Sequence, residues 1–409
     1  MRIFTGATIV DLDSGEHRPG WSLGVEGGKV VAAGAAEAVA AEAGADAETI
    51  DVGAGYLLPG LINCHVHLDL ALPGASYIHD ETRDARVLRT MLNGERSVAA
   101  GVTTVRLTGT KDHVEFTLRD LIEAGQVAGP RIFTAGHGVT STGGHGHATF
   151  VEADGPAEFR KAARAQLTIG ADLVKICISG GIAGRHETGR DTQLFADEMA
   201  AAIEVAHMWG KHVTAHAGPA AGITTAIEQG IDCIEHGYYL DKATTDLMAE
   251  RGVWLVPTIG VSRCGEFYER IGAPCWMIEK GLASAEDHWQ GLVHAIDSGV
   301  RLAMGTDMYP HEELDGTTAT VCELEWYQQA GLSPLESLRT ATVNPAALLR
   351  QSGLLGTLAV GAHADLVVVD DDPLVDVAAL RGIRFVAKGG VVARDDRSGF
   401  SIARPRWAP

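Results

Sequence analysis

The sequence lacks an excess of basic residues and lacks any long apolar run. Its 33 lysines and arginines are outnumbered by 53 aspartates and glutamates, which gives a net charge of −20. Because nucleic-acid binding requires a basic face that contacts phosphates, this balance argues against a nucleic-acid partner. No uninterrupted apolar stretch is long enough to span a bilayer, so we do not expect a membrane protein.

Paired cysteines and a signal peptide are also lacking. The six cysteines, at positions 64, 177, 233, 264, 275 and 322, show no spacing typical of a disulfide framework or a cysteine metal site. Reduced, mostly buried cysteines are typical of cytosolic proteins. The opening segment MRIFTGATIVDLDSG has no apolar core of a signal peptide. We therefore expect a cytoplasmic protein.

The middle of the chain, by contrast, alternates strand and helix patterns. Apolar segments predict eight strands: LINCHVH, TTVRL, RIFTA, DLVKICI, HVTAH, DCIEH, VWLVP and RLAMGTD. Helical segments lie between them, and several end in glycine, such as VLRTMLNGERSVAAG and PAEFRKAARAQLTIG. This alternation over residues 60–352 predicts an α/β fold, a closed (β/α)8 TIM barrel. An open doubly wound sheet is the alternative, although no Gly-rich phosphate fingerprint follows the first strand.

The two ends of the chain share a pattern of short strands and turns. RIFTGATIV and TIDVGAGYLLP at the start are matched by GTLAVGAHADLVVVDDDP and IRFVAKGGVVARDD near the end. Each end alone offers too few strands to be stable. We therefore predict that residues 1–59 and 353–409 pair into one small β-sandwich domain.

Six polar residues are expected to meet at one end of the barrel, where catalytic side chains follow the C-terminal ends of strands. His65 and His67 are two residues apart at the end of the first strand, so both project from one face. Comparable positions late in the fourth, fifth, sixth and eighth strands are occupied by Lys175, His216, His236 and Asp307. Four histidines, a lysine and an aspartate at one barrel mouth indicate a metal site.

Each of these residues also has a structural interpretation. Asp307 follows Gly-Thr and would suit a turn or a helix N-cap. Lys175 could be a core lysine paired with an acid, although lysines are rarely fully buried. His216 and His236 could each be a hydrogen-bonded core histidine.

Taken together, these motifs resemble the metal-dependent amidohydrolase superfamily over nearly the whole chain. The segments GVTTVR, VKICISGG, AERGVWLVPT and ESLRTATVNPAALL are similar to its imidazolonepropionase-like group, whose relatives include prolidase-like carboxypeptidases. The resemblance implies a centre of two divalent metal ions: one held by His65, His67 and Asp307, a second held by His216 and His236, and a carbamate on Lys175, formed with CO2, bridging both. Zinc is the expected metal, with manganese, cobalt and iron as alternatives.

The reaction that the resemblance implies is hydrolysis of an amide in a small molecule. A hydroxide bridging the metals would attack the carbonyl, and Asp307 would pass its proton to the leaving nitrogen. A dipeptide or N-acyl amino acid would then release its C-terminal amino acid. Ring opening of a cyclic amide and deamination are alternatives on the same barrel, and a non-catalytic binding protein is a third. By analogy with other such barrels, a homo-oligomer is also considered.

Substrate contacts are expected in the loops that follow the strands. His145 in TGGHG matches a histidine that meets the substrate in related enzymes, and Tyr238 follows IEHG. Arg185 could clamp a substrate carboxylate through paired hydrogen bonds. A solvated loop position, or packing in the case of Tyr238, is the alternative for each.

Two further loops are expected at the barrel mouth. The long loop ALPGASYIHDETRDAR after the first strand could act as a lid. The segment after the last strand departs from the relatives and carries His311, Glu312 and Glu313. Because loops after barrel strands set specificity, this departure means that the identity of the released amino acid is not predicted. A second departure is Leu107, where relatives often have an acid after GVTTVR.

Overall fold

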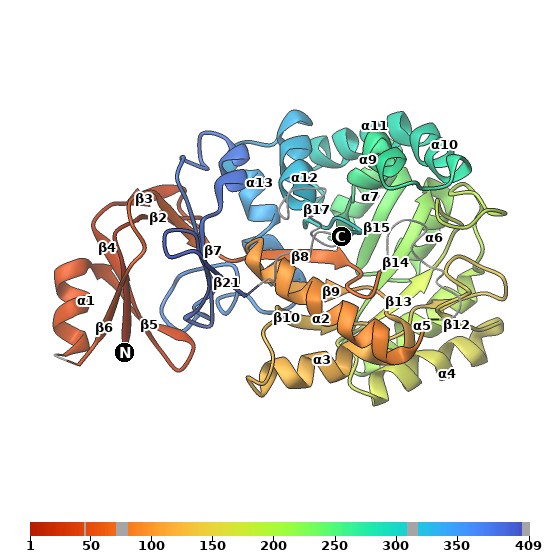
Figure 1. The fold of residues 1–409 in the computed structure, drawn as a ribbon. Coiled ribbons are helices and arrows are strands. Elements are labelled where there is room, and N and C mark those ends of the chain that lie inside the picture. The colour runs from red at the N-terminus through yellow and green to blue at the C-terminus, as the bar shows by residue number, and fades with distance from the viewer. Residues whose placement is uncertain (45, 71–80, 309–317, 403–409) are drawn as a thin grey trace.

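The computed structural model describes residues 1–44, 46–70, 81–308 and 318–402. The chain forms two parts that lie side by side (Figure 1). One is rich in strands and contains β1–β7 (residues 2–59) and β18–β21 (residues 366–401) from the early and late parts of the chain, and the other is a larger α/β part.

The β-rich part contains two sheets. The first has four strands in the order β5-β4-β1-β6, namely Lys29–Ala35, Trp21–Glu26, Arg2–Thr5 and Glu48–Asp51. The second has seven strands in the order β21-β20-β19-β18-β7-β2-β3, namely Phe400–Ser401, Val391–Asp395, Phe385–Lys388, Leu366–Val369, Tyr56–Pro59, Thr8–Asp11 and Glu16–Arg18. Helix α1 (Ala36–Ala43) follows β5.

Strands from the two chain ends are paired within the second sheet. β7 runs antiparallel to β18, with Leu57 opposite Val368 and Leu58 opposite Val367. Apolar side chains from both sheets, including Phe4, Leu57 and Val368, form one buried cluster. Burial of this shared apolar surface stabilises the contact between segments that lie far apart in sequence.

The α/β part is built on parallel strands. A three-stranded sheet contains β8 (Leu61–Val66), β9 (Val102–Leu107) and β10 (Arg131–Thr134). A seven-stranded sheet has the order β12-β11-β13-β14-β15-β16-β17, namely Val151–Glu152, Val139–Thr140, Leu173–Cys177, His212–Pro219, Cys233–Tyr239, Trp254–Val256 and Arg301–Leu302. Each of the eight predicted strand segments overlaps one of these strands, and β11 and β12 are short additions.

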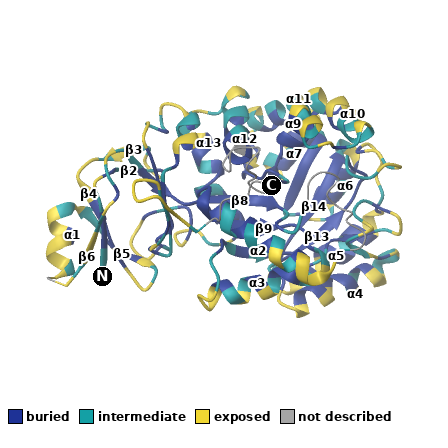
Figure 2. Cartoon of the chain, in the orientation of Figure 1, coloured by how far each residue is buried: buried dark blue, intermediate teal, exposed yellow. Residues whose placement is uncertain are grey.

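Helices surround these strands. They are α2 (Arg83–Ala99), α3 (Val114–Glu123), α4 (Gly155–Thr168), α5 (Ala196–Met208), α6 (Ala220–Glu228), α7 (Lys242–Arg251), α8 (Gly260–Arg263), α9 (Gly265–Arg270), α10 (Cys275–Ala283), α11 (Ala285–Asp297), α12 (Thr318–Gln329), α13 (Pro334–Thr340) and α14 (Val343–Leu348). The 3-10 helices η1 (Lys111–His113) and η3 (Val377–Gly382) complete the set. The strands are buried, and the outer helix faces are exposed (Figure 2). As predicted, glycines with positive φ follow several helices, such as Gly210 after α5 and Gly299 after α11.

The strands form two sheets, whereas the sequence predicts one closed ring of eight. The main difference is at the predicted strand 301–307, of which only Arg301–Leu302 is a strand. Ala303 N still donates to Leu255 O of β16, and the chain then changes its backbone partner, because Met304 N donates to Thr340 O. Hydrogen bonds still link the two sheets, from Cys64 N to Met304 O (2.8 Å) and from Asp172 N to Thr134 O (2.7 Å). The observed architecture is a TIM-barrel-like α/β fold.

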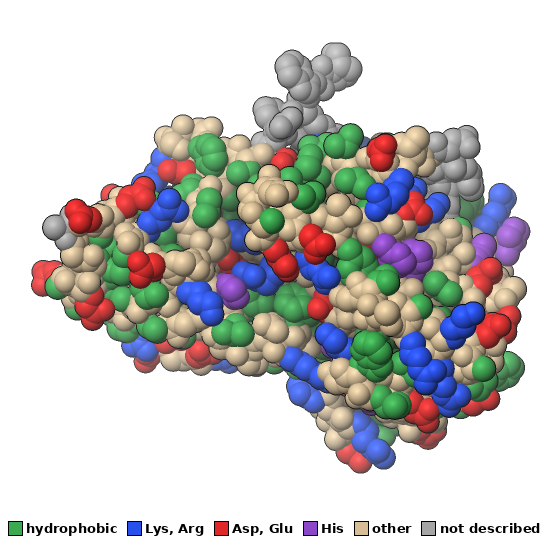
Figure 3. Space-filling model, turned by 90° about the horizontal axis from the view of Figure 1, so that it is seen from below, with side chains coloured by type: hydrophobic (Ala, Val, Ile, Leu, Met, Phe, Trp, Pro, Cys, Tyr) green, Lys and Arg blue, Asp and Glu red, His purple; other side chains and the backbone are tan. Residues whose placement is uncertain are grey.

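Charged side chains of both signs lie on the surface. On the face seen in Figure 3, acidic and basic side chains are interspersed, and no continuous basic area is visible. Among the described residues, no helix combines the length and apolar character needed to cross a bilayer.

Candidate active site

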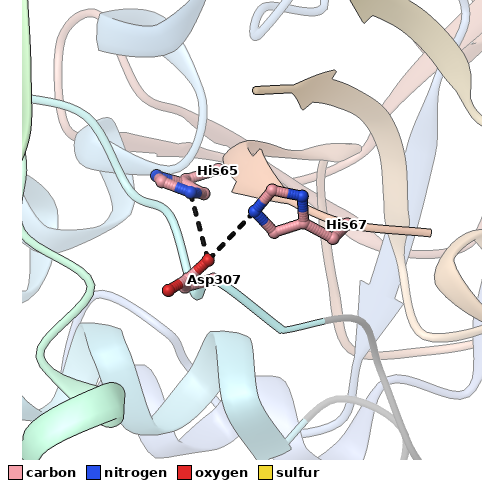
Figure 4. Close-up of side chains that lie close together, drawn as sticks. All are labelled: His65, His67 and Asp307. Carbon is pink, nitrogen blue, oxygen red and sulfur yellow. Dashed lines mark ion pairs between the residues drawn. The ribbon is translucent and has the colours of Figure 1, made fainter. Parts of the chain in front are cut away.

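Three of the predicted residues meet as a compact group (Figure 4). His65 is in β8, His67 follows it, and Asp307 lies beyond β17. Asp307 Oδ1 is 3.1 Å from His65 Nε2 and 3.2 Å from His67 Nε2. One ligand atom from each residue lies within 4.8 Å of the others, a spacing that could hold a metal ion. Two imidazoles and a carboxylate are a donor set that suits zinc and other transition metals.

A buried ion pair orients His65. Glu235 Oε2 is 2.7 Å from His65 Nδ1, so Nε2 is the nitrogen that faces Asp307. The other carboxylate oxygen pairs with Arg106 and also accepts a hydrogen bond from Thr214. Burial would raise the pKa of Glu235, but the Arg106 guanidinium holds it well below its usual value. A carboxylate that fixes the tautomer of a metal-binding histidine is a common supporting contact.

Asp307 lies between two imidazoles. Burial would raise the pKa of Asp307, but the neighbouring His65 and His67 hold it well below its usual value. Burial would lower the pKa of His67, but its hydrogen bond to Asp307 raises it. On its other side, His67 Nδ1 is 2.9 Å from Gly109 O, so Nε2 is available towards Asp307.

His216 and His236 lie next to this group. The His236 ring centroid is 4.9 Å from that of His65 and 4.7 Å from that of His216. His216 Nε2 is 3.1 Å from Gly180 O, which leaves Nδ1 available. His236 Nδ1 is 2.6 Å from Thr258 Oγ1, which leaves Nε2 available. Burial lowers the pKa of both histidines well below the usual value, and neutral imidazole is the form that binds metals.

Lys175 is a buried lysine near these two histidines. It is the third residue of β13 and is 2 % exposed. Its charge adds to burial in lowering the pKa of His216 and His236. Within the described part of the chain, Lys175 has no ion pair or hydrogen bond to an acid. The acid that it influences, Glu235, is already paired with Arg106, so the interpretation of Lys175 as an acid-paired core lysine gains no support.

The backbone at the site differs from the predicted strand ends. His216 and His236 lie inside β14 and β15, which continue past them to Pro219 and Tyr239. His236, Thr258 and Asp307 all have positive φ, at 66°, 52° and 57°. Such φ values are uncommon outside glycine, and local strain of this kind concentrates at functional sites.

His145 packs directly against the histidine cluster. Its ring stacks on that of His216, with centroids 3.9 Å apart and planes at 11°. Its Nδ1 is 2.6 Å from Glu187 Oε1, which holds it in place. Gly181 lies against both rings, because an added Cβ there would approach His145 Cε1 to 2.4 Å and His216 Cε1 to 2.9 Å. Glycine is therefore the residue that this contact requires.

The other predicted substrate contacts differ in their surroundings. Tyr238 is buried, and its ring stacks on His236 with centroids 5.0 Å apart. Arg185 is exposed at the pocket and forms no ion pair with any described residue. Most of the predicted lid, residues 71–80, lies outside the described residues, as do His311, Glu312 and Glu313.

A pocket of about 510 Å³ opens above the histidines. Among the residues that line it are His67, His145, Arg185, His216, Tyr238 and Asp307. His65 and Lys175 are not part of the lining and are buried. Three of the six predicted metal-site residues, His67, His216 and Asp307, thus line one cavity, and His65 and His236 pack against this group from outside the lining. Such a cavity is the kind of place where small-molecule sites form.

Sequence reasoning missed the supporting residues Arg106, Glu235, Thr258 and Glu187. Arg106 and Glu235 are the one basic residue of β9 and the one acidic residue of β15, and this signal could have identified them as a buried pair. Thr258 and Glu187 lie in loops and carry no comparable signal.

The comparison with known proteins agrees with this geometry. The Amidohydrolase family profile matches residues 56–394. The chain belongs to this family. Among solved structures, a prolidase in complex with N-methylphosphonate-L-proline aligns with a TM-score of 0.88, is 27% identical, and covers 96% of this chain and 99% of its own. Ochratoxinase from Aspergillus niger is 28% identical over 374 residues, which is 82% of this chain and 75% of the relative.

A third relative of this amidohydrolase is imidazolonepropionase from Symbiobacterium thermophilum. It is 25% identical over 405 residues, which is 90% of this chain and 88% of the relative. The predicted family is therefore confirmed, and the protein is a hydrolase that acts on carbon–nitrogen bonds. The His65, His67 and Asp307 group agrees with the metal dependence general in this family.

Proposed function

We propose that this amidohydrolase uses two divalent metal ions to cleave a dipeptide or an N-acyl amino acid and to release the C-terminal amino acid. The observation that carries the proposal is that His65, His67 and Asp307 lie together with the neutral His216 and His236, and that three of these residues line one pocket. Similarity to a prolidase and to an ochratoxinase supports it.

The proposed ligands divide into two sets. His65, His67 and Asp307 hold the first ion, and His216 and His236 hold the second, with zinc the expected metal. We propose that Lys175 bridges them as a carbamate formed with CO2. A buried ammonium without an acidic partner is unfavourable beside two cations, whereas a carbamate supplies anionic oxygen ligands. When bound, such ions polarise a carbonyl and lower the pKa of water.

The surrounding side chains have proposed roles around the scissile amide. Asp307 accepts the proton of the attacking water and delivers it to the leaving nitrogen. His145 lies beside His216 and meets the carbonyl or carboxylate of the substrate. Tyr238 lines the pocket, and Arg185 binds the carboxylate of the C-terminal amino acid.

We also propose a division of the chain into two domains. Residues 60–352 form the closed catalytic barrel, and residues 1–59 with 353–409 form a β-sandwich domain. The hydrogen bonds that link the two strand sheets support closure, and the pairing of β7 with β18 supports the joint domain. Cytoplasmic location and homo-oligomerisation stay predictions.

Opening of a cyclic amide is the second candidate reaction, since imidazolonepropionase is among the relatives. A panel of dipeptides, N-acyl amino acids and lactams separates the two reactions, with metal content measured in parallel. We expect two metal ions per chain and release of a free amino acid. Opening of lactams without release of an amino acid would contradict the proposal.

A further inference from the structure

One wall of the pocket is apolar. Its described members are Ile182, Val261, Tyr268, Trp276 and Met277, which we call the apolar wall. Ile182 follows β13, and the other four come from α8, α9 and α10 between β16 and α11. Val261 is buried and the others are half-buried. Four of the five also line a small cavity behind the pocket, so the apolar surface continues behind the wall.

The apolar wall and the loop after β13 are joined by one lysine. Lys280 of α10 donates to Gly184 O and also to Glu187 O at 2.5 Å. Its Nζ also lies over the Trp276 ring, 5.6 Å from the centroid. These contacts hold α10 against the loop that carries Ile182 and Arg185.

Arg185 lies beside the apolar wall, and no described acid forms an ion pair with it. It lies three residues after Ile182, lines the pocket and is exposed. The other arginine in this loop, Arg190, is occupied by Asp287 at 2.6 Å. On another part of the lining, Arg89 pairs with Glu81 at 2.7 Å. Within the described lining, Arg185 therefore differs from Arg89, because no described acid neutralises its charge.

We propose that the apolar wall is the subsite for the side chain of the released amino acid, and that this amino acid is large and apolar, either aromatic or branched aliphatic. The proposal rests on the proposed function. The carboxylate and the side chain of an amino acid leave the same carbon atom. An amino acid held at Arg185 by its carboxylate therefore directs its side chain to the neighbouring Ile182 and to helices α8–α10, where apolar burial favours it.

Two series of N-acyl amino acids test which group occupies the apolar wall. The first keeps the acetyl group and varies the amino acid among Phe, Leu, Gly, Asp and Lys. The second keeps glycine as the amino acid and varies the acyl group. We expect kcat/KM to be at least about tenfold higher for Phe and Leu than for Gly, Asp and Lys. A preference set by the acyl group, or one for small or charged amino acids, would overturn the proposal.

Matched methionine variants separate the subsite from general damage. Met277→Ala should lower kcat/KM for N-acetyl-Phe about tenfold and leave N-acetyl-Gly unchanged. Met208→Ala, a control in α5 where Met208 is 80 % exposed, should change neither. Equal losses for both substrates in Met277→Ala would overturn the apolar wall as a specificity site.

Binding of free amino acids distinguishes failure of the subsite from failure of the proposed function. Isothermal titration with free phenylalanine and glycine needs no catalysis. Phenylalanine binding that Met277→Ala weakens would support the subsite even if no amide were cleaved. Phenylalanine binding no tighter than glycine binding would overturn it.

Discussion

The two halves of the candidate metal centre are held by different forces. Around His65 the supporting contacts are charged, because Glu235 joins its imidazole to the guanidinium of Arg106 and all three side chains are buried. Around His236 the support is neutral, with the Thr258 hydroxyl at Nδ1 and the Tyr238 ring stacked on its face. The first half also contains a carboxylate, Asp307, whereas the second half contains two imidazoles.

This difference predicts that the two halves differ in whether their metal binding depends on Lys175. The first half has a complete donor set of two histidines and one aspartate in the protein alone. The second half needs an anionic ligand, which we propose to be the carbamate on Lys175. We therefore expect the first half to bind a metal ion without Lys175 and the second half to bind one only when the carbamate is present.

The largest effect should come from Asp307→Asn, which removes the carboxylate from the first half. Loss of the group that transfers the proton should lower kcat by about 10²- to 10⁴-fold. Metal content should also fall, because an amide oxygen is a weaker ligand than a carboxylate. The matched control is Asp297→Asn at the exposed end of α11, which should leave both quantities unchanged. Full activity in Asp307→Asn would remove the distinction between the halves.

Lys175→Met tests the conditional half. Metal analysis of the purified variant should find one ion per chain in place of two, since His65, His67 and Asp307 still form a donor set. Lys161→Met, at an exposed position of α4, is the control and should keep both ions. Two tightly bound ions in Lys175→Met would contradict the proposed difference between the halves, because the second half would then need no carbamate.

Glu235→Gln tests the charged support of the first half. It leaves the buried charge of Arg106 without its carboxylate, so the free energy of unfolding should fall by about 3–5 kcal/mol. Affinity for the first metal should fall about 10- to 100-fold, because the orientation of His65 loosens. Both are measurable, by denaturant unfolding and by metal titration.

A double variant keeps the Glu235 prediction informative even if Glu235→Gln folds poorly. Adding Arg106→Met removes the unpaired charge and should recover most of the lost stability. The loss of metal affinity should remain, because Gln carries no charge to fix the His65 tautomer. Recovery of affinity in the double variant would show that the charge of Glu235 is not what supports His65.

The smallest effect should come from Thr258→Ala in the neutral half. Removing one uncharged hydrogen bond to His236 should lower the free energy of unfolding by about 1 kcal/mol. Affinity for the second metal should fall by about tenfold, and the first ion should bind as before. Thr258→Ser keeps the hydroxyl and should bind both ions normally. A loss as large as that in Glu235→Gln would mean that charge does not separate the two halves.

Much of the fold could be predicted because its signals are local. Apolar runs and helix-ending glycines identified the strands and several helices, and parallel strands bring their C-terminal ends together. This is why His65, His67 and Asp307 could be expected to meet. The domain boundaries stay predictions.

What could not be predicted depends on contacts between distant segments. Arg106 and Glu235 are 129 residues apart, and their pairing follows from strand positions that the sequence does not give. Asp307 has a positive φ, and at the nearby Gly305 an added Cβ would approach His65 N to 2.9 Å. A pattern of apolar and polar residues cannot show such a close approach.

The pairing of β7 with β18 also affects folding during synthesis, because the two strands are made at different times. Pro59 leaves the ribosome more than 300 residues before Leu366, its partner in the ladder. At about 5–20 residues per second, that interval lasts roughly 15–60 s. During this time the edge of β7 that later pairs with β18 has no partner strand. An unpaired edge of this kind is a site at which chaperones can bind the nascent chain.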